Sequence, residues 1–316
     1  MFKYIWKRIL IAIPVLIGIT IIDFALMNLA PGSPLDMLQG PRVSQAAVEM
    51  RAEQLGINEP IHIQYLTWMK ELFKGNLGHS ISKYTPVTQM IGEHIGPTVL
   101  LIGVSLIISL GLAIPLGVYS ATHQYGKADY GIVAFSFVGT SIPSFFLANI
   151  LIYIFTIKLK ILPSSGMMTL GTSGGFFDIV KHMVMPVMVL VCSLTGTYLR
   201  YIRSSMLEIL QQDYLRTAKG KGIGRYLVIH RHAMRNALLP IISVIGMQIP
   251  MLVGGAVIVE KVFSWPGLGL LTMNAILARD YPVIMGVCLL SAVIVVIGNL
   301  LTDIAYAIAD PRIRYD

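Results

Sequence analysis

Two Gly-Lys pairs are the residues of this sequence that most closely match a nucleotide-binding motif. A phosphate-binding loop needs a further glycine five residues before the glycine of such a pair, so that backbone N–H groups surround the phosphates. Ala121 stands at that position before Gly126-Lys127, and Leu215 stands there before Gly220-Lys221. The chain therefore has no ATP site of this type, and energy for its activity must come from a partner protein or an ion gradient.

Ionisable residues inside apolar runs are a mark of ion-driven transport, because a charge is kept there mainly where it binds or relays ions. Asp23 and Asp303 are such residues, and neither has an evident basic partner in another run. Because the runs contain so few acidic residues, an ion-coupled secondary transporter is only the remote alternative. Asp303 can equally form a hydrogen bond to a neighbouring helix or lie near the inner membrane interface. His230 and His232 would need further ligands to bind a metal. We expect no metal site, no catalytic residue and no enzyme.

The composition places these residues in a membrane protein. Of the 316 residues, 55% are hydrophobic and 13% are charged, and the mean hydropathy is +0.72. A soluble domain has about a quarter charged residues. These values exclude a disordered chain, a disulfide scaffold and a nucleic-acid-binding module. Six runs reach or approach the roughly 20 residues that cross a bilayer, and they predict an all-α protein with six transmembrane helices: 9–29, 98–120, 132–157, 184–203, 237–259 and 283–309.

The basic residues predict the orientation of these spans. With the N-terminus inside, the inner segments and the adjoining Arg200 and Arg203 hold more than half of the 24 Lys and Arg residues, in about half the length of the outer segments. Such an excess is typical of cytoplasmic segments, so both termini are expected in the cytoplasm. The residues before Pro31 form no small-x-small cleavage site, so the first run is expected to remain as an uncleaved span. The inner segments are 1–8, 121–131, 204–236 and 310–316.

The inner segment 204–236 is too long to be a simple loop. It predicts a short helix capped by Asp213, then an elbow containing Gly220, Gly222 and Gly224, then a second helix. A segment that only fixes topology would explain the Lys and Arg residues. A docking surface on the cytoplasmic face also explains the short helix and its elbow, and we favour that interpretation.

The outer segment, 30–97, predicts two amphipathic helices, one from Ser44 to Gly56 and one from Pro60 to Gly75. They form either a small extracellular platform that meets a partner or a cap on the membrane surface. Between the fifth and sixth spans, Phe263 and Trp265 are expected to anchor at the membrane interface. A role in an outer gate is the alternative.

Polar and pliable residues within the spans are candidates for lining a transport path. Small and hydroxyl residues also serve as contacts between membrane helices, and packing is the expected role of most of them. A lining with few charges suits a substrate held by its backbone, which fits peptides of varied sequence. The candidates are Ser136, Thr140, Ser141, Met247 and Gln248, with Asn149, Thr195 and Thr197 as further ones.

The inner segment resembles the loop that carries the EAA motif in ABC-transporter permeases, in the version of the peptide (oligopeptide and dipeptide) class. The resemblance rests on DYLRTAKGKG at 213–222 and RHAMRNALLP at 231–240; the usual glutamate is absent, with Arg216 near its place, as looks typical of this class. Further motifs of such permeases follow in order along nearly the whole chain: APGSP at 30–34, NLGHS at 76–80, LPSSG at 162–166, FSWPGLG at 263–269, RDYPV at 279–283, DIAY at 303–306 and DPR at 310–312.

The resemblance implies a type I ABC importer permease fold with a small extracellular helical insertion, in a bacterial or archaeal cell membrane. A homologous permease subunit would complete the pore, two cytoplasmic ATPase subunits would hold ATP and Mg, and an extracellular substrate-binding protein would deliver peptide. Nickel and glutathione are the alternative substrates. The implied regions are 1–29 (first span), 30–97 (extracellular), 98–309 (core), 204–236 (coupling loop within the core) and 310–316 (cytoplasmic tail).

The resemblance also implies which residues couple this chain to the ATPase subunits. Apolar contacts are expected from Tyr214, Leu215 and Ala218, and contacts to acidic groups from Arg216 and Lys219. The whole implied set is Asp213, Tyr214, Leu215, Arg216, Thr217, Ala218, Lys219, Gly220 and Gly222.

Overall fold

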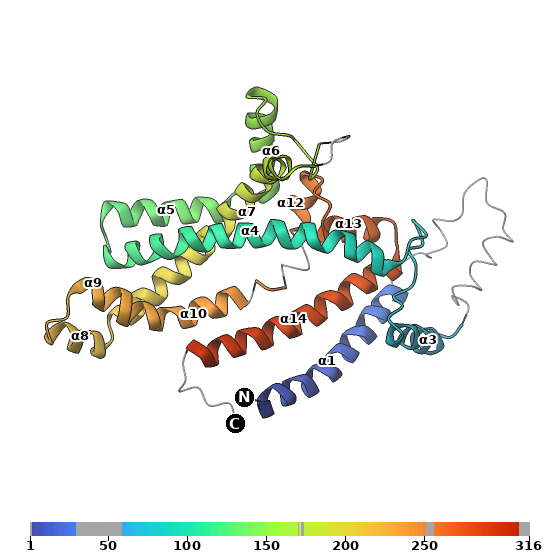
Figure 1. Cartoon of the computed structure of the whole chain (residues 1–316), viewed down its shortest axis with the longest axis horizontal. Helices are drawn as coiled ribbons and strands as arrows, with labels where there is room; N and C mark the ends of the chain where they lie inside the picture. The colour runs from blue at the N-terminus through green and yellow to red at the C-terminus, as the bar shows by residue number, and fades with distance from the viewer. Residues whose placement is uncertain are drawn as a thin grey trace.

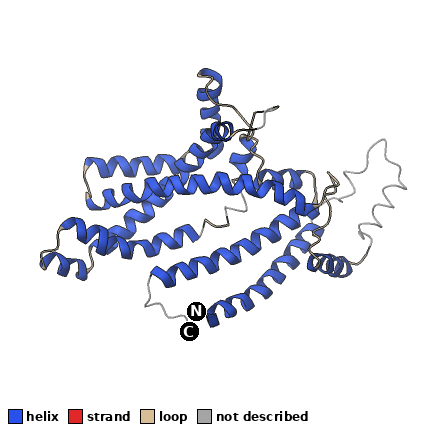
Figure 2. Cartoon of the chain, in the orientation of Figure 1, coloured by secondary structure: helices blue, strands red, loops and turns tan. Residues whose placement is uncertain are grey.

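The computed structural model describes residues 2–29, 59–169, 171, 174–246, 248–250 and 256–309. Within these ranges the chain is built of helices, and an isolated bridge between His79 and Pro86 is the one β pairing among them (Figure 2). The all-α expectation is confirmed for these residues. The expected helix from Ser44 to Gly56 and the tail 310–316 lie outside them.

Four helices are long and apolar enough to cross a membrane: α1 (Phe2–Leu29), α4 (Val87–Thr122), α7 (Phe176–Leu210) and α14 (Tyr281–Ala309). They contain most or all of the first, second, fourth and sixth expected runs. The 36 residues of α4 make a helix of about 54 Å, which is longer than the roughly 30 Å hydrocarbon core. The expectation of six spans is not confirmed, because length and composition support four, or five if one bent helix pair counts as a span.

That bent pair replaces the third expected span. The run is divided into α5 (Lys127–Ser141) and a second arm made of α6 (Ser144–Leu151) and the π-helix η2 (Ile152–Lys158), with 96° between the two arms. Pro143 causes the break, because its ring disfavours the helical conformation of the preceding residue. Ile142 is accordingly extended, with φ −77° and ψ 122°.

The fifth expected span is also not one continuous helix. The chain forms α8 (Asp213–Gly220), α9 (Arg225–Leu227), the π-helix η3 (Val228–Ala233) and α10 (Met234–Gly246), followed by a turn at 248–250. Beyond residues 251–255, which lie outside the described part, come α12 (Val257–Val262) and α13 (Leu268–Leu277). The candidate residue Met247 also lies outside the described residues.

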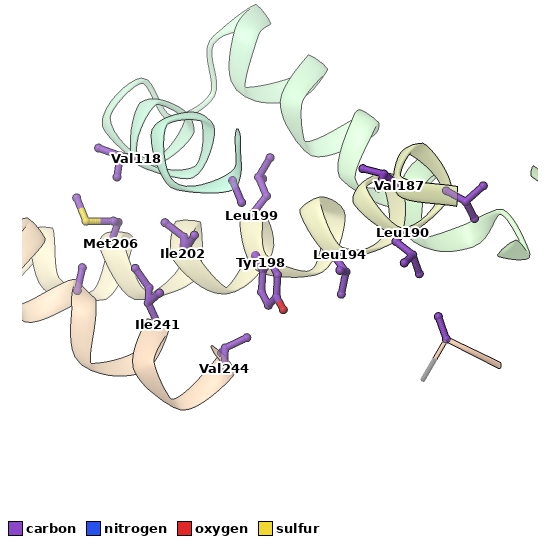
Figure 3. Packing of buried hydrophobic residues seen from close by; sticks show 14 of the residues in the cluster. Val118, Val187, Leu190, Leu194, Tyr198, Leu199, Ile202, Met206, Ile241 and Val244 are labelled. Carbon is purple, nitrogen blue, oxygen red and sulfur yellow. The ribbon is translucent and has the colours of Figure 1, made fainter. Parts of the chain in front are cut away.

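The helix α7 is the centre of the larger core, since α4, α5 and α10 all pack against it (Figure 1). Tyr198 and Ile202 are among its fully buried side chains. Figure 3 shows Val118 of α4 on one side of α7 and Ile241 and Val244 of α10 on the other. The helix that leads directly into α8 is therefore held on two sides.

Small residues let α5 approach α7 closely. A Cβ added at Gly139 of α5 would lie 2.6 Å from the carbonyl oxygen of Cys192, and one added at Gly196 of α7 would lie 2.5 Å from that of Ser136. Small residues at such contacts let two backbones come together in a membrane protein. The two helices therefore meet almost backbone to backbone.

A second core joins α4, α13 and α14. It contains Val87, Leu268 and Val283, all fully buried. Next to this region α1 packs beside α14, and α3 (Ile61–Phe73) packs against α1 (Figure 1). The helix α3 corresponds to the expected helix that starts at Pro60.

Candidate functional site

The short helix α8 follows α7 after only two residues, Gln211 and Gln212. The carbonyl oxygen of Gln212 accepts the backbone N–H groups of Leu215 (3.1 Å) and Arg216 (3.4 Å). Asp213 therefore lies in the first turn and is not the cap that its sequence position suggests. A carboxylate there interacts favourably with the positive end of the helix dipole.

A glycine elbow ends α8. Gly222 has φ +81°, a left-handed conformation that costs glycine little. The N–H of Ile223 donates back to the carbonyl oxygen of Ala218 at 3.3 Å, which is the six-to-one bond of a Schellman ending. Gly220 is the last residue of α8, and α9 begins directly after Gly224. The expected order of short helix, glycine elbow and second helix is present in the structure.

The side chains of α8 divide into an inner and an outer set. Leu215 is fully buried and Ala218 is 9% exposed, and both belong to the core that also holds Val228 and Ala233. Both side chains therefore pack on their own chain, and Tyr214 is the exposed one of the three residues expected to make apolar contacts with a partner. The exposed residues are Asp213, Tyr214, Arg216 and Thr217; the side chain of Lys219 lies outside the described part.

A buried ion pair lies near the end of α7 that leads into α8. Arg203 donates from Nε and Nη2 to the two carboxylate oxygens of Asp129, at 2.9 and 3.0 Å, and also from Nε to Ser120 at 2.9 Å. Asp129 further accepts the Ser120 hydroxyl and, at 3.0 Å, the backbone N–H of Tyr125. The group ties the end of α4 and the start of α5 to α7.

Sequence reasoning missed this pair. Arg203 counted only as a charge that sets topology, and Asp129 was not singled out at all. An acid at the start of an apolar run, two residues after Lys127, is a signal that could have prompted a search for its partner.

The segment after the elbow is tied to the same place. Arg225 of α9 donates from Nη2 to the carbonyl oxygen of Thr122, the last residue of α4, at 2.9 Å. Beside it lies a cavity of about 430 Å³ lined by Ala121, Thr122, Leu210, Arg225 and Ile229. Both flanks of α8 therefore connect to the end of α4, one through α7 and one through Arg225.

The candidate pore residues Ser136 and Thr140 lie at the contact of α5 with α7. Ser136 is fully buried and donates its hydroxyl to the carbonyl oxygen of Val133 at 2.7 Å, and Thr140 donates to Ser136 at 3.1 Å. A Cβ at Gly196 would meet both residues. Both residues therefore take part in the packing of α5 on α7, which is the alternative that the sequence left open. Ser141 is exposed and Gln248 is half-buried, so neither is buried in helix packing.

The remaining polar candidates for the transport path are Asn149, Thr195 and Thr197. Asn149 is exposed and Thr197 is half-buried, and each donates to the backbone carbonyl oxygen one turn earlier, at 2.8 and 3.2 Å. Thr195 is buried, and its hydroxyl has no hydrogen-bond partner within the described part of the chain. No continuous polar path is evident from these residues.

The motif at 263–269 encloses a buried carboxylate. Glu260 accepts bonds from the Thr98 hydroxyl (3.0 Å) and the Leu270 N–H (2.9 Å). Trp265 is fully buried and donates its indole N–H to Pro97 at 2.9 Å. Phe263 is 1% exposed. The expectation that Phe263 and Trp265 anchor at the membrane interface is therefore wrong, since both face the interior of the chain.

Motifs that are far apart in the sequence meet at this end of the molecule. Asp280 of RDYPV accepts a hydrogen bond from the hydroxyl of Ser80 (2.5 Å), the last residue of NLGHS. It also accepts one from the N–H of Ile81 (3.0 Å), the residue after that motif. Gly166 of LPSSG donates its N–H to the carbonyl oxygen of Phe263 at 2.8 Å. These family motifs are structural connections between helices.

Asp303 has a basic partner, contrary to the expectation from sequence. Arg8 of α1 lies 2.8 Å from the Asp303 carboxylate of α14. The side chains of His230 and His232 lie outside the described part. Among the residues that the structure does describe, no three His, Cys, Asp or Glu residues gather as a metal site would require.

Comparisons with known proteins agree with this arrangement. The family described as "Binding-protein-dependent transport system inner membrane component" matches residues 113–315, and its N-terminal counterpart matches residues 1–102. The chain belongs to this family of membrane transport components. The "Oligopeptide transport system permease protein AppB" of Bacillus subtilis (strain 168) is 46% identical over 316 residues, covering all of both chains.

Two further relatives extend the comparison. The "Dipeptide transport system permease protein DppB" of Alkalihalophilus pseudofirmus is 38% identical, again over the whole of both chains. A chain of the MetNI methionine ABC transporter, in an inward-facing conformation, has a similar fold with a TM-score of 0.57 at 16% identity, covering 71% of this chain and 97% of that one. The resemblance to ABC permeases of the peptide class is confirmed, and the protein is a multi-pass inner-membrane permease.

Proposed function

We propose that this chain is the pore-forming permease subunit of an ATP-driven, binding-protein-dependent peptide importer. The observation that carries the proposal is the 46% identity, over the full length of both chains, to a relative named as an oligopeptide permease. The likeness of the fold to an ABC transporter chain supports the transport mechanism. We infer a type I importer fold and no enzymatic activity of the chain itself.

The partners in this proposal are a homologous permease subunit, two cytoplasmic ATPase subunits that bind ATP and Mg, and an extracellular substrate-binding protein. Both termini and α8 face the cytoplasm, and α3 lies outside. The region boundaries remain 1–29, 30–97, 98–309 (with the coupling loop at 204–236) and 310–316. We keep Ser141 and Gln248 as candidates for the pore, because neither is buried against another helix.

The helix α8 is the proposed contact with the ATPase subunits. Its exposed side chains, including Tyr214, Arg216 and Thr217, form the docking face, while Leu215 and Ala218 hold the helix on its own chain. Asp213, Lys219, Gly220 and Gly222 complete the segment. A short helix fixed to a long one can pass on the rigid-body closure of a motor as a hinge-type transition.

The outer helix α3 is better suited to the membrane surface than to a platform. Tyr65 and Trp68 pack against Phe24 of α1, with the Tyr65 hydroxyl 3.0 Å from that of Thr20. Leu66 and Phe73, at 63% and 82% exposure, continue the apolar side of the helix. Such a helix lies in the interface with its apolar side toward the acyl chains.

Reversing a charge on α8 tests the docking face. Arg216→Glu should lower the amount of ATPase subunit that co-purifies with the permease, because an exposed charge at an interface governs association. Glu208→Lys, an exposed charge reversal two residues before the end of α7, is the matched control outside α8. Equal recovery of ATPase from wild type and Arg216→Glu would contradict docking at this face.

Transport assays test the substrate and the energy source. The assembled transporter is expected to take up labelled di-, tetra- or pentapeptides, with ATP removal or vanadate stopping uptake and an uncoupler leaving it intact. Uptake of nickel or glutathione instead would favour those alternatives. Uptake that an uncoupler abolishes would favour the ion-coupled carrier, against which the pairing of Asp303 with Arg8 already argues.

A further inference from the structure

We propose that Arg203 and Asp129 are positioning residues for energy coupling. Their ion pair makes α4, α5 and α7 move as one body with α8, so that a displacement at the docking face reaches the arm of α5. The inference rests on the proposed function in one respect, which is that a motor acts on α8.

The first step is the connection from α8 to its neighbours. Gln211 and Gln212 alone separate α8 from α7, and Leu215 is fully buried in the core that α7 organises. On the other flank Arg225 bonds to the carbonyl oxygen of Thr122 at 2.9 Å. A push on α8 is therefore delivered to the ends of both α7 and α4.

The second step is the attachment of α5. Backbone contact at Gly139 and Gly196 resists separation of α5 from α7, but small side chains offer little interlocking against sliding along the axes. The two parallel bonds from Arg203 to Asp129, at 2.9 and 3.0 Å, fix both distance and direction, as planar guanidinium–carboxylate pairs do. The pair therefore supplies the resistance to sliding that the glycine contact lacks.

The third step is the environment of the pair. The Asp129 side chain is 3% exposed and that of Arg203 is 23% exposed. Ser120 and the Tyr125 N–H complete the set of donors around the carboxylate. Losing Arg203 would leave the buried carboxylate of Asp129 unpaired, which is strongly unfavourable. The ion pair consequently has one stable arrangement and holds α5 in a fixed position relative to α7.

Arg200 provides a matched control on the same helix. It lies one turn before Arg203, is exposed, and its guanidinium stands over the ring of Phe137 at 5.4 Å. Arg200 carries the same charge as Arg203 and lies on the same helix, and its contact with Phe137 also reaches α5. Unlike Arg203, it does not take part in a buried ion pair with any residue that the structure describes. Loss of Arg200 tests the effect of removing a charge from α7 without breaking the proposed link.

The functional test uses the assembled transporter in proteoliposomes and measures peptides moved per ATP hydrolysed. Arg203→Gln and Asp129→Asn are expected to assemble and to hydrolyse ATP, with this ratio at least about tenfold lower, within the usual range of coupling between sites. Arg203→Lys should restore it only in part, because lysine lacks the planar fork. Arg200→Gln should stay within about twofold of wild type, since an exposed cation–ring contact is weak.

Each outcome has one meaning. An unchanged ratio in Arg203→Gln would overturn the positioning role, and so would uptake and hydrolysis that fall together in proportion to lost complex, since that indicates stability alone. A wild-type complex that hydrolyses ATP without moving peptide would contradict the proposed function instead.

A distance measurement tests the link without any transported substrate. Spin labels at Tyr130→Cys on α5 and Gln212→Cys directly before α8, both exposed positions outside the docking face, are placed in a chain whose Cys192 and Cys288 are changed to Ser. One narrow distance distribution is expected with and without ATP. Arg203→Gln should broaden it, and a distribution as narrow as that of wild type would overturn the link.

Discussion

Glu260 explains why glycine stands at two positions of the FSWPGLG motif. A Cβ at Gly267 would meet the Glu260 carboxylate and the Thr98 hydroxyl, and a Cβ at Gly269 would lie 2.9 Å from the same carboxylate. The backbone of Gly267 has φ −100°, which any residue adopts. The requirement for glycine is therefore one of space around a buried acid.

We expect Gly267→Ala to destabilise the protein by about 1–3 kcal/mol, the usual cost of overpacking a filled site. Gly103→Ala on α4 is the control, because a Cβ there meets nothing within 4 Å and helical alanine is favoured over glycine by up to about 1 kcal/mol. Thermal unfolding in detergent measures both. Equal midpoints for the two variants would show that Glu260 has room to move.

Sequence reasoning recognised the FSWPGLG segment as a unit but not what it surrounds. Trp265 and Phe263 carry an aromatic signal that membrane interfaces and buried cores share. The residue that decides between them, Glu260, and its partner Thr98 are 162 positions apart. Nothing local in either residue indicates the other, so their burial could only come from the three-dimensional structure.

The helix α8 shows what a pattern can predict about an element. The glycine spacing predicted where the helix stops, because a left-handed residue is a local requirement that Gly222 meets. Which face of the helix turns inward was not predictable, since Leu215 and Ala218 suit the chain's own core and a partner's surface equally well. Packing against η3 decides it.

The division of α8 into two faces predicts opposite results for neighbouring positions. Leu215→Ala should cost about 2–5 kcal/mol through loss of a fully buried side chain. Arg216→Ala, at an exposed position, should change stability by no more than about 0.5 kcal/mol. Urea unfolding of the detergent-solubilised chain measures the difference. Similar losses at both positions would mean that α8 is packed on both sides.

The third expected span shows where the sequence pattern did not predict the path of an element. Its apolar length was sufficient, and membrane helices do tolerate proline; α4 indeed continues through Pro97 and Pro115. At Pro143 the helix instead bends by 96°. The sequence alone does not distinguish these prolines, because neighbouring helices decide whether a freed carbonyl finds another donor.

At the scale of the whole molecule, contacts between distant segments hold the ends of the chain in place. Arg8 and Asp303 join α1 to α14, and Asp280 joins the start of α14 to the turn at 80–82. Hydropathy predicted that α1 and α14 are long apolar helices. That these two helices are neighbours depends on contacts between residues some 200 to 300 positions apart, and no local pattern in the sequence contains that information.

The proposed orientation predicts opposite labelling at two exposed positions. In a chain without Cys192 and Cys288, Lys74→Cys at the end of α3 should react with a membrane-impermeant maleimide in intact cells. Tyr226→Cys on α9 should react only after the cells are opened. Both side chains are exposed and neither belongs to the proposed docking face, so a negative result is meaningful. Reaction of Tyr226→Cys in intact cells would reverse the topology.

The enclosure of Trp265 gives the protein a built-in optical reporter. Of the three tryptophans, Trp6 is 54% exposed and Trp68 lies on α3, whereas Trp265 is fully buried beside Glu260. With Trp6 and Trp68 changed to Phe, the remaining emission should be blue-shifted and poorly quenched by water-soluble iodide. Any loosening of the structure around Trp265 during a transport cycle would then be visible as a red shift in real time.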